Sequence, residues 1–158
     1  MADGLDRFVA RAREAGLEVS PTRFPAGTRT AQDAAEAIGC DIAQIVKSLV
    51  FVADDAPVLV LTSGANRVDE TRLAEHLAAR QVRKATADEV RRATGYAIGG
   101  TPPFGHDAPL VVLCDVDLTD HDEVWAAAGT ADSVFALTPA RLVEVSGARE
   151  VAVAPESR

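Results

Sequence analysis

Two short apolar runs near the middle of the chain constrain its fold more than any other feature. The first is VKSLVFV at 46–52, and the second is VLVLTS at 58–63. Between them lies Asp-Asp-Ala-Pro, a composition that is typical of turns. Two β-favouring runs at this spacing predict an antiparallel hairpin, so a sheet must form part of the fold.

Short helices and further strands alternate along the rest of the chain. Helices are predicted where a capping residue, a glycine stop or an amphipathic spacing marks them, at 5–16, 30–39, 69–77, 86–95, 120–129 and from 138 onward. Strands are predicted at 81–86, 109–115, 133–138 and 149–155. We find no internal repeat, linker or low-complexity tract, and therefore expect one α/β domain over residues 1–158 with a mixed sheet.

Composition excludes several classes of protein. The chain has 158 residues, of which 47% are apolar, and its net charge is −8. That charge argues against a protein that mainly coats nucleic-acid phosphates, although basic residues crowd the middle of the chain at Arg67, Arg72, Arg80, Arg83, Lys84, Arg91 and Arg92. No apolar run approaches the ~18 residues of a membrane span, and the acidic start MADGLD does not resemble a signal peptide. Cys40 and Cys114 have no framework spacing, which favours reduced thiols and a cytoplasmic location.

The segment 95–106, GYAIGGTPPFGH, is unusually rich in residues that control the backbone. Gly99 and Gly100 permit positive φ or close approach to a ligand, and Pro102 and Pro103 stiffen the second half of the segment. Such a loop can hold main-chain donors and acceptors at set positions around a small polar ligand. An elaborate turn between two strands is the alternative interpretation.

Lys47 interrupts the apolar run 46–52, where only Ser48 is otherwise polar. A lysine at the mouth of a buried strand is partly desolvated, so it needs an anionic or carbonyl partner or a lowered pKa. Lysines of this kind orient carbonyls and carboxylates. The alternative is a strand-end lysine whose ammonium group extends to water.

Other chemistries lack their sequence patterns. His106, Asp115, Asp117 and His121 could in principle bind zinc, but no recognised ligand spacing is present, and the two aspartates fit strand-end and turn positions. The serine-hydrolase elbow G-x-S-x-G and the phosphate-binding motifs G-x-x-x-x-G-K-[ST] and G-x-G-x-x-G are also absent. No cofactor or metal is therefore expected.

Several stretches together resemble the family of YbaK and prolyl-tRNA-synthetase-associated editing domains. They are TAQDAAEAIGCDIAQIVKSLVF at 30–51, NRVDETRLA at 66–74, TGYAIGGTPPFGH at 94–106, DVDL at 115–118 and WAAAGTADSVFALTPARL at 125–142. The resemblance covers about three-quarters of the chain. It implies an α/β domain with a mixed, barrel-like sheet surrounded by short helices.

The resemblance also implies an activity, which is hydrolysis of the ester between a wrong amino acid and a tRNA 3′ end. By position, Lys47 matches the essential lysine of the family, and the substrate-binding residues correspond to Ser48, Gly99, Gly100, Thr101, Pro102 and Gly129. A lysine and fixed backbone donors can orient an ester and stabilise its oxyanion while water attacks, so this chemistry requires no metal.

Two positions depart from the family pattern. Ala127 stands where members that edit cysteine carry serine, so small amino acids such as alanine or serine are expected as substrates. Arg72 stands where lysine is common, a change that keeps the charge but alters its geometry.

We therefore expect a freestanding deacylase that acts on mischarged tRNA. The acidic balance implies weak intrinsic affinity for tRNA, as expected if a synthetase or an elongation factor delivers the substrate. The alternative is a non-catalytic module that binds tRNA, a synthetase or a small ligand on the same fold.

Overall fold

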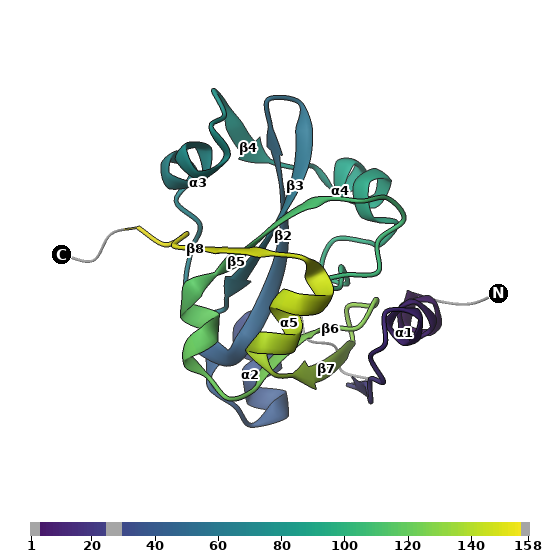
Figure 1. The fold of residues 1–158 in the computed structure, drawn as a ribbon. Coiled ribbons are helices and arrows are strands. Elements are labelled where there is room, and N and C mark those ends of the chain that lie inside the picture. The colour runs from purple at the N-terminus through teal and green to yellow at the C-terminus, as the bar shows by residue number, and fades with distance from the viewer. Residues whose placement is uncertain (1–3, 25–29, 156–158) are drawn as a thin grey trace.

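One mixed sheet organises the molecule (Figure 1). The computed structural model describes residues 4–24 and 30–155. Its strands are β1 (Thr22–Arg23), β2 (Ile45–Ala53), β3 (Ala56–Ser63), β4 (Val82–Lys84), β5 (Val111–Asp115), β6 (Val124–Ala127), β7 (Ser133–Leu137) and β8 (Arg149–Val151). The hydrogen-bonded order is β1-β7-β6-β2-β3-β5-β8, and β4 pairs with β2. The predicted α/β fold with a mixed sheet is confirmed, and across the described residues β1, β4 and β8 each pair with a single strand.

The predicted central hairpin is formed by β2 and β3. The two strands pair antiparallel from Val46 opposite Ser63 to Ala53 opposite Ala56. Asp54 and Asp55 make the turn with φ values of 46° and 71°. Positive φ at both turn residues matches the twist of the flanking strands, which is why this turn closes a tight hairpin.

The other edge of β2 is only partly paired. Near its start, β2 pairs with β6 at Ile45 and Val46, and near its end it pairs with β4 from Phe51 to Ala53. Residues 47–49 lie between these two partners, and no strand of the described residues pairs with them on that side. The gap therefore leaves main-chain groups of β2 free for another partner.

Five helices flank the sheet in the described residues. They are α1 (Gly4–Glu14), α2 (Ala31–Ile38), α3 (Glu70–Leu77), α4 (Ala87–Thr94) and α5 (Pro139–Ser146), with short 3₁₀ turns at Ile42–Gln44 and Val116–Asp120. In the view of Figure 1, α1 and α3 lie on opposite sides of the β2–β3 hairpin. The predicted caps are confirmed, since Thr30, Asp69, Thr86 and Thr138 each accept a hydrogen bond from a first-turn amide.

The helix predicted at 120–129 is wrong. This segment contains β6, which pairs antiparallel with β7 and parallel with β2. Val124 and Ala126 are buried, whereas Trp125 and Ala127 are partly exposed, so burial alternates as in a strand. Pairing with two neighbouring strands outweighs the local signal of Asp120 and Glu123.

The sheet separates two apolar clusters. Phe8, Leu59, Leu61, Phe104 and Phe135 belong to the larger cluster. The smaller cluster contains Phe51, Val60, Leu73, Leu113 and Val153. Because side chains alternate across a strand, successive residues of β2 and β3 contribute to opposite clusters.

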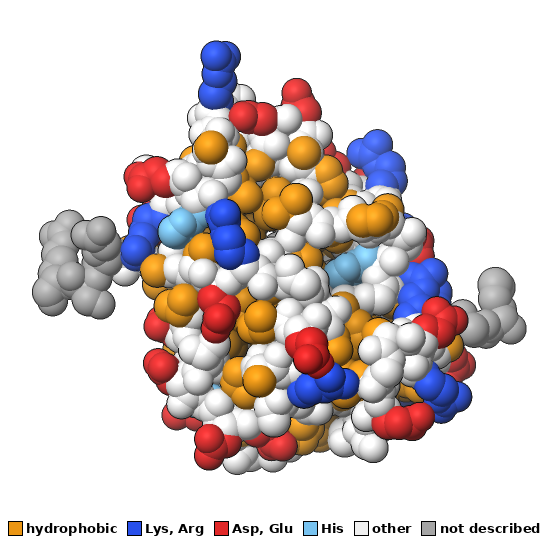
Figure 2. Space-filling model, in the orientation of Figure 1, with side chains coloured by type: hydrophobic (Ala, Val, Ile, Leu, Met, Phe, Trp, Pro, Cys, Tyr) orange, Lys and Arg blue, Asp and Glu red, His pale blue; other side chains and the backbone are white. Residues whose placement is uncertain are grey.

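The surface mixes charges of both signs. On the face shown in Figure 2, basic and acidic side chains are interspersed between apolar patches. No helix among the described residues is both long enough and apolar enough to cross a membrane.

Candidate active site

A cavity of about 560 Å³ opens at the unpaired part of β2. Its lining is mostly apolar and comes from α2, β2, the loop after α4, β6 and the start of β7. The main apolar lining residues are Ile42, Ile45, Leu49, Ile98, Trp125 and Val134. Lys47, Ser48, Gly99 and Thr101, four of the residues predicted from the sequence, line the same cavity.

Lys47 supplies a positive charge to this largely apolar site. Its side chain is half-buried, and its Nζ donates a 2.6 Å hydrogen bond to the main-chain oxygen of Asn66. Burial lowers the pKa of Lys47 below its ordinary value, and the nearby Lys84 lowers it further, while Asp115 acts in the opposite direction. An ammonium group has three N–H donors, so the bond to Asn66 leaves two for a ligand.

Asn66 is held by two carboxylates. Its Nδ2 donates to Oδ2 of Asp115 at 2.8 Å and to Oδ2 of Asp117 at 2.7 Å. Asp115 is buried and also accepts the main-chain N–H of Ser63 at 3.1 Å. The carbonyl that receives Lys47 is thus fixed by a network anchored at the ends of β3 and β5. Asn66 was not among the residues predicted from the sequence, although it opens the stretch NRVDETRLA that supports the family resemblance.

Ser48 offers polar groups that the fold leaves unsatisfied. Its Oγ is buried and has no hydrogen-bond partner among the described residues. Its main chain faces the gap as well, because Val50, two residues further along β2, accepts the N–H of Ala85 on that side and alternate residues point the same way. A buried hydroxyl without a partner costs free energy.

The segment 95–106, called here the glycine-proline loop, contributes the opposite wall of the cavity through Ile98, Gly99 and Thr101. Gly99 has φ of +86° and lies next to exposed Ile98 at the cavity. Thr101 is buried, and its hydroxyl donates to the main-chain oxygen of Ala97 at 3.1 Å. The loop is therefore ordered by its own hydrogen bonds as well as by its prolines.

Gly100, Pro102 and Gly129 lie behind the cavity wall rather than among its lining residues. A Cβ on Gly100 would lie 2.9 Å from main-chain carbons of Thr130. The Pro102 oxygen is the hydrogen-bond partner of His106 Nε2 at 2.8 Å. Gly129 has φ of +103° and packs so closely on Gly4 that a Cβ would lie 2.2 Å from its carbonyl oxygen. The positive φ considered in the sequence is found at Gly99, whereas Gly100 is required by close packing.

The remaining candidates are used by the fold. Across the described residues, no three histidine, cysteine, aspartate or glutamate side chains come together as a metal site would require. Asp115 is a strand-end residue whose carboxylate caps the N–H of Asp117, as its sequence position suggests. Arg72 donates to the main-chain oxygen of Ala154 at 2.6 Å, and Arg83 pairs with Glu89 at 2.7 Å.

Comparison with known proteins identifies the family of this chain. The family described as "Aminoacyl-tRNA editing domain" matches residues 25–145. This chain therefore belongs to the aminoacyl-tRNA editing domain family, as its sequence resemblance indicates.

Individual relatives fall into two groups. The chain is 39% identical over 90 residues to a proline–tRNA ligase of Ligilactobacillus salivarius (strain UCC118), which covers 57% of this chain and 16% of the ligase. It is 33% identical over 126 residues to protein YwhH of Bacillus subtilis (strain 168), covering 79% of this chain and 80% of YwhH. It thus spans only a small part of the ligase but most of YwhH.

Solved structures show the same fold over nearly the whole chain. One is described as "a putative trans-editing enzyme for prolyl tRNA synthetase", with a TM-score of 0.93, 39% identity and 99% of each chain covered. A second, hypothetical protein APE2540, has a TM-score of 0.86 at 27% identity and covers 94% of this chain and 99% of its own.

Proposed function

We propose that the chain is a freestanding aminoacyl-tRNA deacylase that hydrolyses the ester of a mischarged tRNA and needs no metal. The observation that carries the proposal is Lys47, a half-buried ammonium group bound to a carbonyl rather than a carboxylate, at an apolar cavity. The near-complete match to a structure described as a trans-editing enzyme supports action in trans.

The proposed reaction uses positioning and electrostatics. The ammonium group of Lys47 donates to the carbonyl oxygen of the ester and stabilises the negative charge that develops there. The main-chain groups of Ser48, and those of Gly99 and Thr101 on the opposite wall, hold the aminoacyl group. A water molecule adds to the carbonyl carbon, the bond to the ribose oxygen breaks, and that oxygen leaves with a proton that originates from the water.

Short side chains in the cavity lining favour a small amino acid. Ala126, Ala127, Ala131 and Thr101 contribute short side chains to its lining. Ala127 offers no hydroxyl to a thiol, so we expect alanine or serine to be preferred over cysteine. A one-methylene difference is worth only ~1–3 kcal/mol in such a pocket, which implies overlap among small substrates. The ligase relatives suggest tRNA for proline, and prolyl-tRNA synthetase, as partners.

A panel of mischarged tRNAs tests the proposal. The purified chain is incubated with tRNAs that carry alanine, serine, cysteine or proline, with and without excess chelator, and the remaining ester is measured. We expect hydrolysis of the alanyl or seryl ester well above the uncatalysed rate, unaffected by chelator. Binding of these tRNAs without hydrolysis would favour the non-catalytic module, and loss of activity in chelator would show that a metal is needed.

A further inference from the structure

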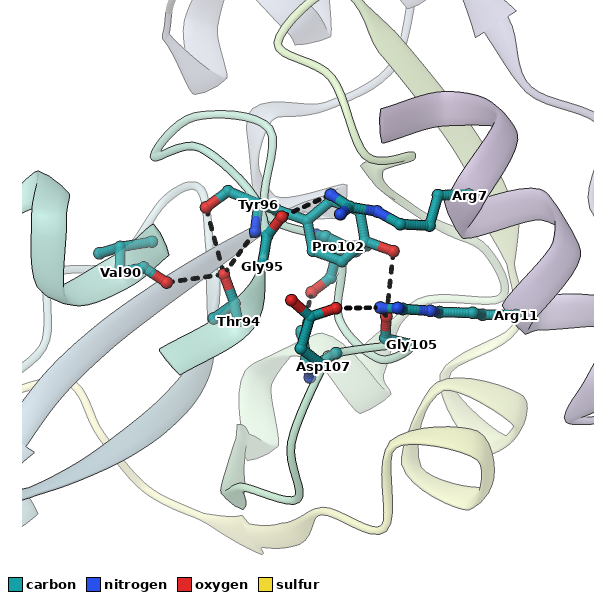
Figure 3. A network of polar contacts seen from close by, with 10 residues as sticks. Arg7, Arg11, Val90, Thr94, Gly95, Tyr96, Pro102, Gly105 and Asp107 are labelled. Carbon is teal, nitrogen blue, oxygen red and sulfur yellow. Dashed lines mark hydrogen bonds and ion pairs between the residues drawn. The ribbon is translucent and has the colours of Figure 1, made fainter. Parts of the chain in front are cut away.

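Helix α1 forms hydrogen bonds with both ends of the glycine-proline loop (Figure 3). Arg7 donates to the main-chain oxygen of Gly95, where α4 ends, and its guanidinium lies 4.4 Å from the centre of the Tyr96 ring. Arg11 donates to the main-chain oxygen of Gly105 at 2.8 Å, near the end of the loop. One helix thus binds the carbonyls on either side of the cavity wall.

The two ends of the loop are also joined to each other. The Tyr96 hydroxyl donates to the Gly105 oxygen at 3.0 Å, and the N–H of Asp107 donates to the Thr94 oxygen at 3.0 Å. Arg11 completes the closure through a 2.7 Å ion pair with Asp107. Figure 3 shows these groups converging between α1 and the end of α4. The segment between them, which includes Gly99 and Thr101, is therefore a closed loop with a fixed base.

A second route connects α1 to the same wall. Gly4, at the start of the helix, packs directly on Gly129, and the next residue, Thr130, packs on Gly100. Both contacts are so close that a Cβ at Gly129 or Gly100 would lie within 3 Å of main-chain atoms. A shift of α1 would therefore displace the loop in two ways, through the arginine bonds at its ends and through the packing of Thr130 on Gly100.

The arginines do more than attach the helix to the protein. Phe8 is completely buried and packs on Phe104 and Phe135 with ring centres 5.1 and 5.0 Å apart, which is an apolar anchor in itself. By contrast, Arg7 carries a buried Nε without a hydrogen-bond partner among the described residues. Burying such a group is costly, and an apolar side chain would attach the helix without that cost. What the arginines provide is directional bonding to the two loop ends.

We propose that Arg7 and Arg11 are positioning residues for the deacylation site, through which α1 sets the distance between the Gly99–Thr101 wall and Lys47. This inference rests on the proposed function for its effect on the reaction. Neither arginine lines the cavity, so each acts through the loop and not on the substrate. Small displacements of a wall that orients an ester have large effects on rate.

Three substitutions and one matched control test this role. Arg7→Met and Arg11→Met keep an unbranched side chain but remove its donors, whereas Arg11→Lys keeps a donor and the charge that faces Asp107. Arg13→Met is the control, because Arg13 lies on the same helix but is exposed and pairs with Glu18, at 3.4 Å, rather than with the loop. For each protein, we would measure kcat and KM with alanyl- and prolyl-tRNA, hydrogen exchange of amides 97–101, and the melting temperature.

We expect Arg7→Met and Arg11→Met to lower kcat/KM for the alanyl ester about tenfold or more, with faster exchange confined to 97–101. Discrimination between alanyl and prolyl esters should also fall, because the wall that limits the pocket moves. Arg11→Lys should restore most of the rate, and Arg13→Met should match the wild type.

Two outcomes would overturn the inference. In one, the methionine variants keep wild-type exchange at 97–101 and wild-type kinetics. In the other, exchange rises equally throughout the sheet, which would show general destabilisation. A wild-type protein that hydrolyses none of the esters would instead refute the proposed function, and the exchange measurement would still decide whether α1 orders the loop.

Discussion

Two cations, Lys47 at the cavity and Arg11 at the base of the glycine-proline loop, use their charges in opposite ways. Arg11 pairs with the Asp107 carboxylate at 2.7 Å, and this hydrogen bond raises its pKa. Lys47 forms no ion pair with any described residue, its partner is a main-chain carbonyl, and burial lowers its pKa. The charge of Arg11 is compensated within the fold, whereas that of Lys47 is available to a ligand. A cation's role thus depends on its partner more than on its exposure.

The largest expected effect is the loss of activity when the uncompensated charge is removed. Lys47→Met should cost at least ~2 kcal/mol of transition-state stabilisation, which is roughly 30-fold or more in rate. The melting temperature should not fall, because the variant removes a desolvated charge and keeps an apolar stem. Single-turnover deacylation and thermal melting measure both. Lys84→Met, at an exposed lysine on β4, is the control and should retain activity; equal rates in Lys47→Met and wild type would rule out the catalytic role.

A second substitution tests how tightly Gly100, behind the cavity wall, packs on Thr130. Gly100→Ala places a Cβ 2.9 Å from main-chain carbons that cannot move independently, so we expect a loss of about 1–3 kcal/mol in unfolding free energy and slower deacylation. Gly99→Ala is the matched variant, because its Cβ meets nothing closer than 4.0 Å. It should cost only about 1 kcal/mol, from its positive φ. Denaturant unfolding of both variants would contradict this account if Gly99→Ala were the less stable.

The pH dependence of deacylation should distinguish Lys47, whose charge has no acidic ion-pair partner among the described residues, from the arginines of α1. In the proposed mechanism Lys47 acts in its charged form, so the catalysed rate should fall as pH rises through its lowered pKa, after uncatalysed ester hydrolysis is subtracted. Because the folded state binds this proton less tightly than the unfolded state, the contribution of Lys47 to stability rises with pH between its lowered pKa and the ordinary value of 10.5. Lys84→Met should move the alkaline limb to higher pH, whereas Arg13→Met should leave it in place.

The smallest expected effect concerns the reactivity of the two thiols, whose pKa values are raised by burial. Burial raises the pKa of Cys114 to about 12, and Cys114 is fully buried, whereas Cys40 is half-buried with a smaller upward shift in pKa. A thiol reagent at neutral pH should therefore modify Cys40 slowly and Cys114 only after unfolding. Mass spectrometry of the native and denatured protein gives the number of modified cysteines. Modification of Cys114 in the native protein would show that this part of the core opens.

Local signals in the sequence predicted much of the fold. The hairpin and the caps at Thr30, Asp69 and Thr86 depend on residues close in sequence, and these predictions are confirmed. The helix predicted at 120–129 failed because its segment is a strand held by β2, whose residues lie about 80 positions earlier. Local propensity carries no information about such a partner.

The site shows the same division between local and distant information. The family resemblance identified Lys47 and Ser48 and the loop near them in space, and the structure brings both to one cavity with Gly99 and Thr101. Asn66 was missed because it acts through its main-chain oxygen, which no residue type reveals. Arg7 and Arg11 could not be singled out from the sequence either, since their partners lie 88 and 94 positions away.

The helix that grips the loop lies outside the segment by which the family is recognised. That segment is 25–145, yet Phe8 in α1 and Val153 beyond β8 are both fully buried in the two apolar clusters. The segment that matches the family is thus shorter than the segment that builds the apolar clusters. A fragment cut at the boundaries of the family match would expose both clusters and would lose the arginines that bind the ends of the loop. Transfer of this domain to another protein therefore requires residues 4–153.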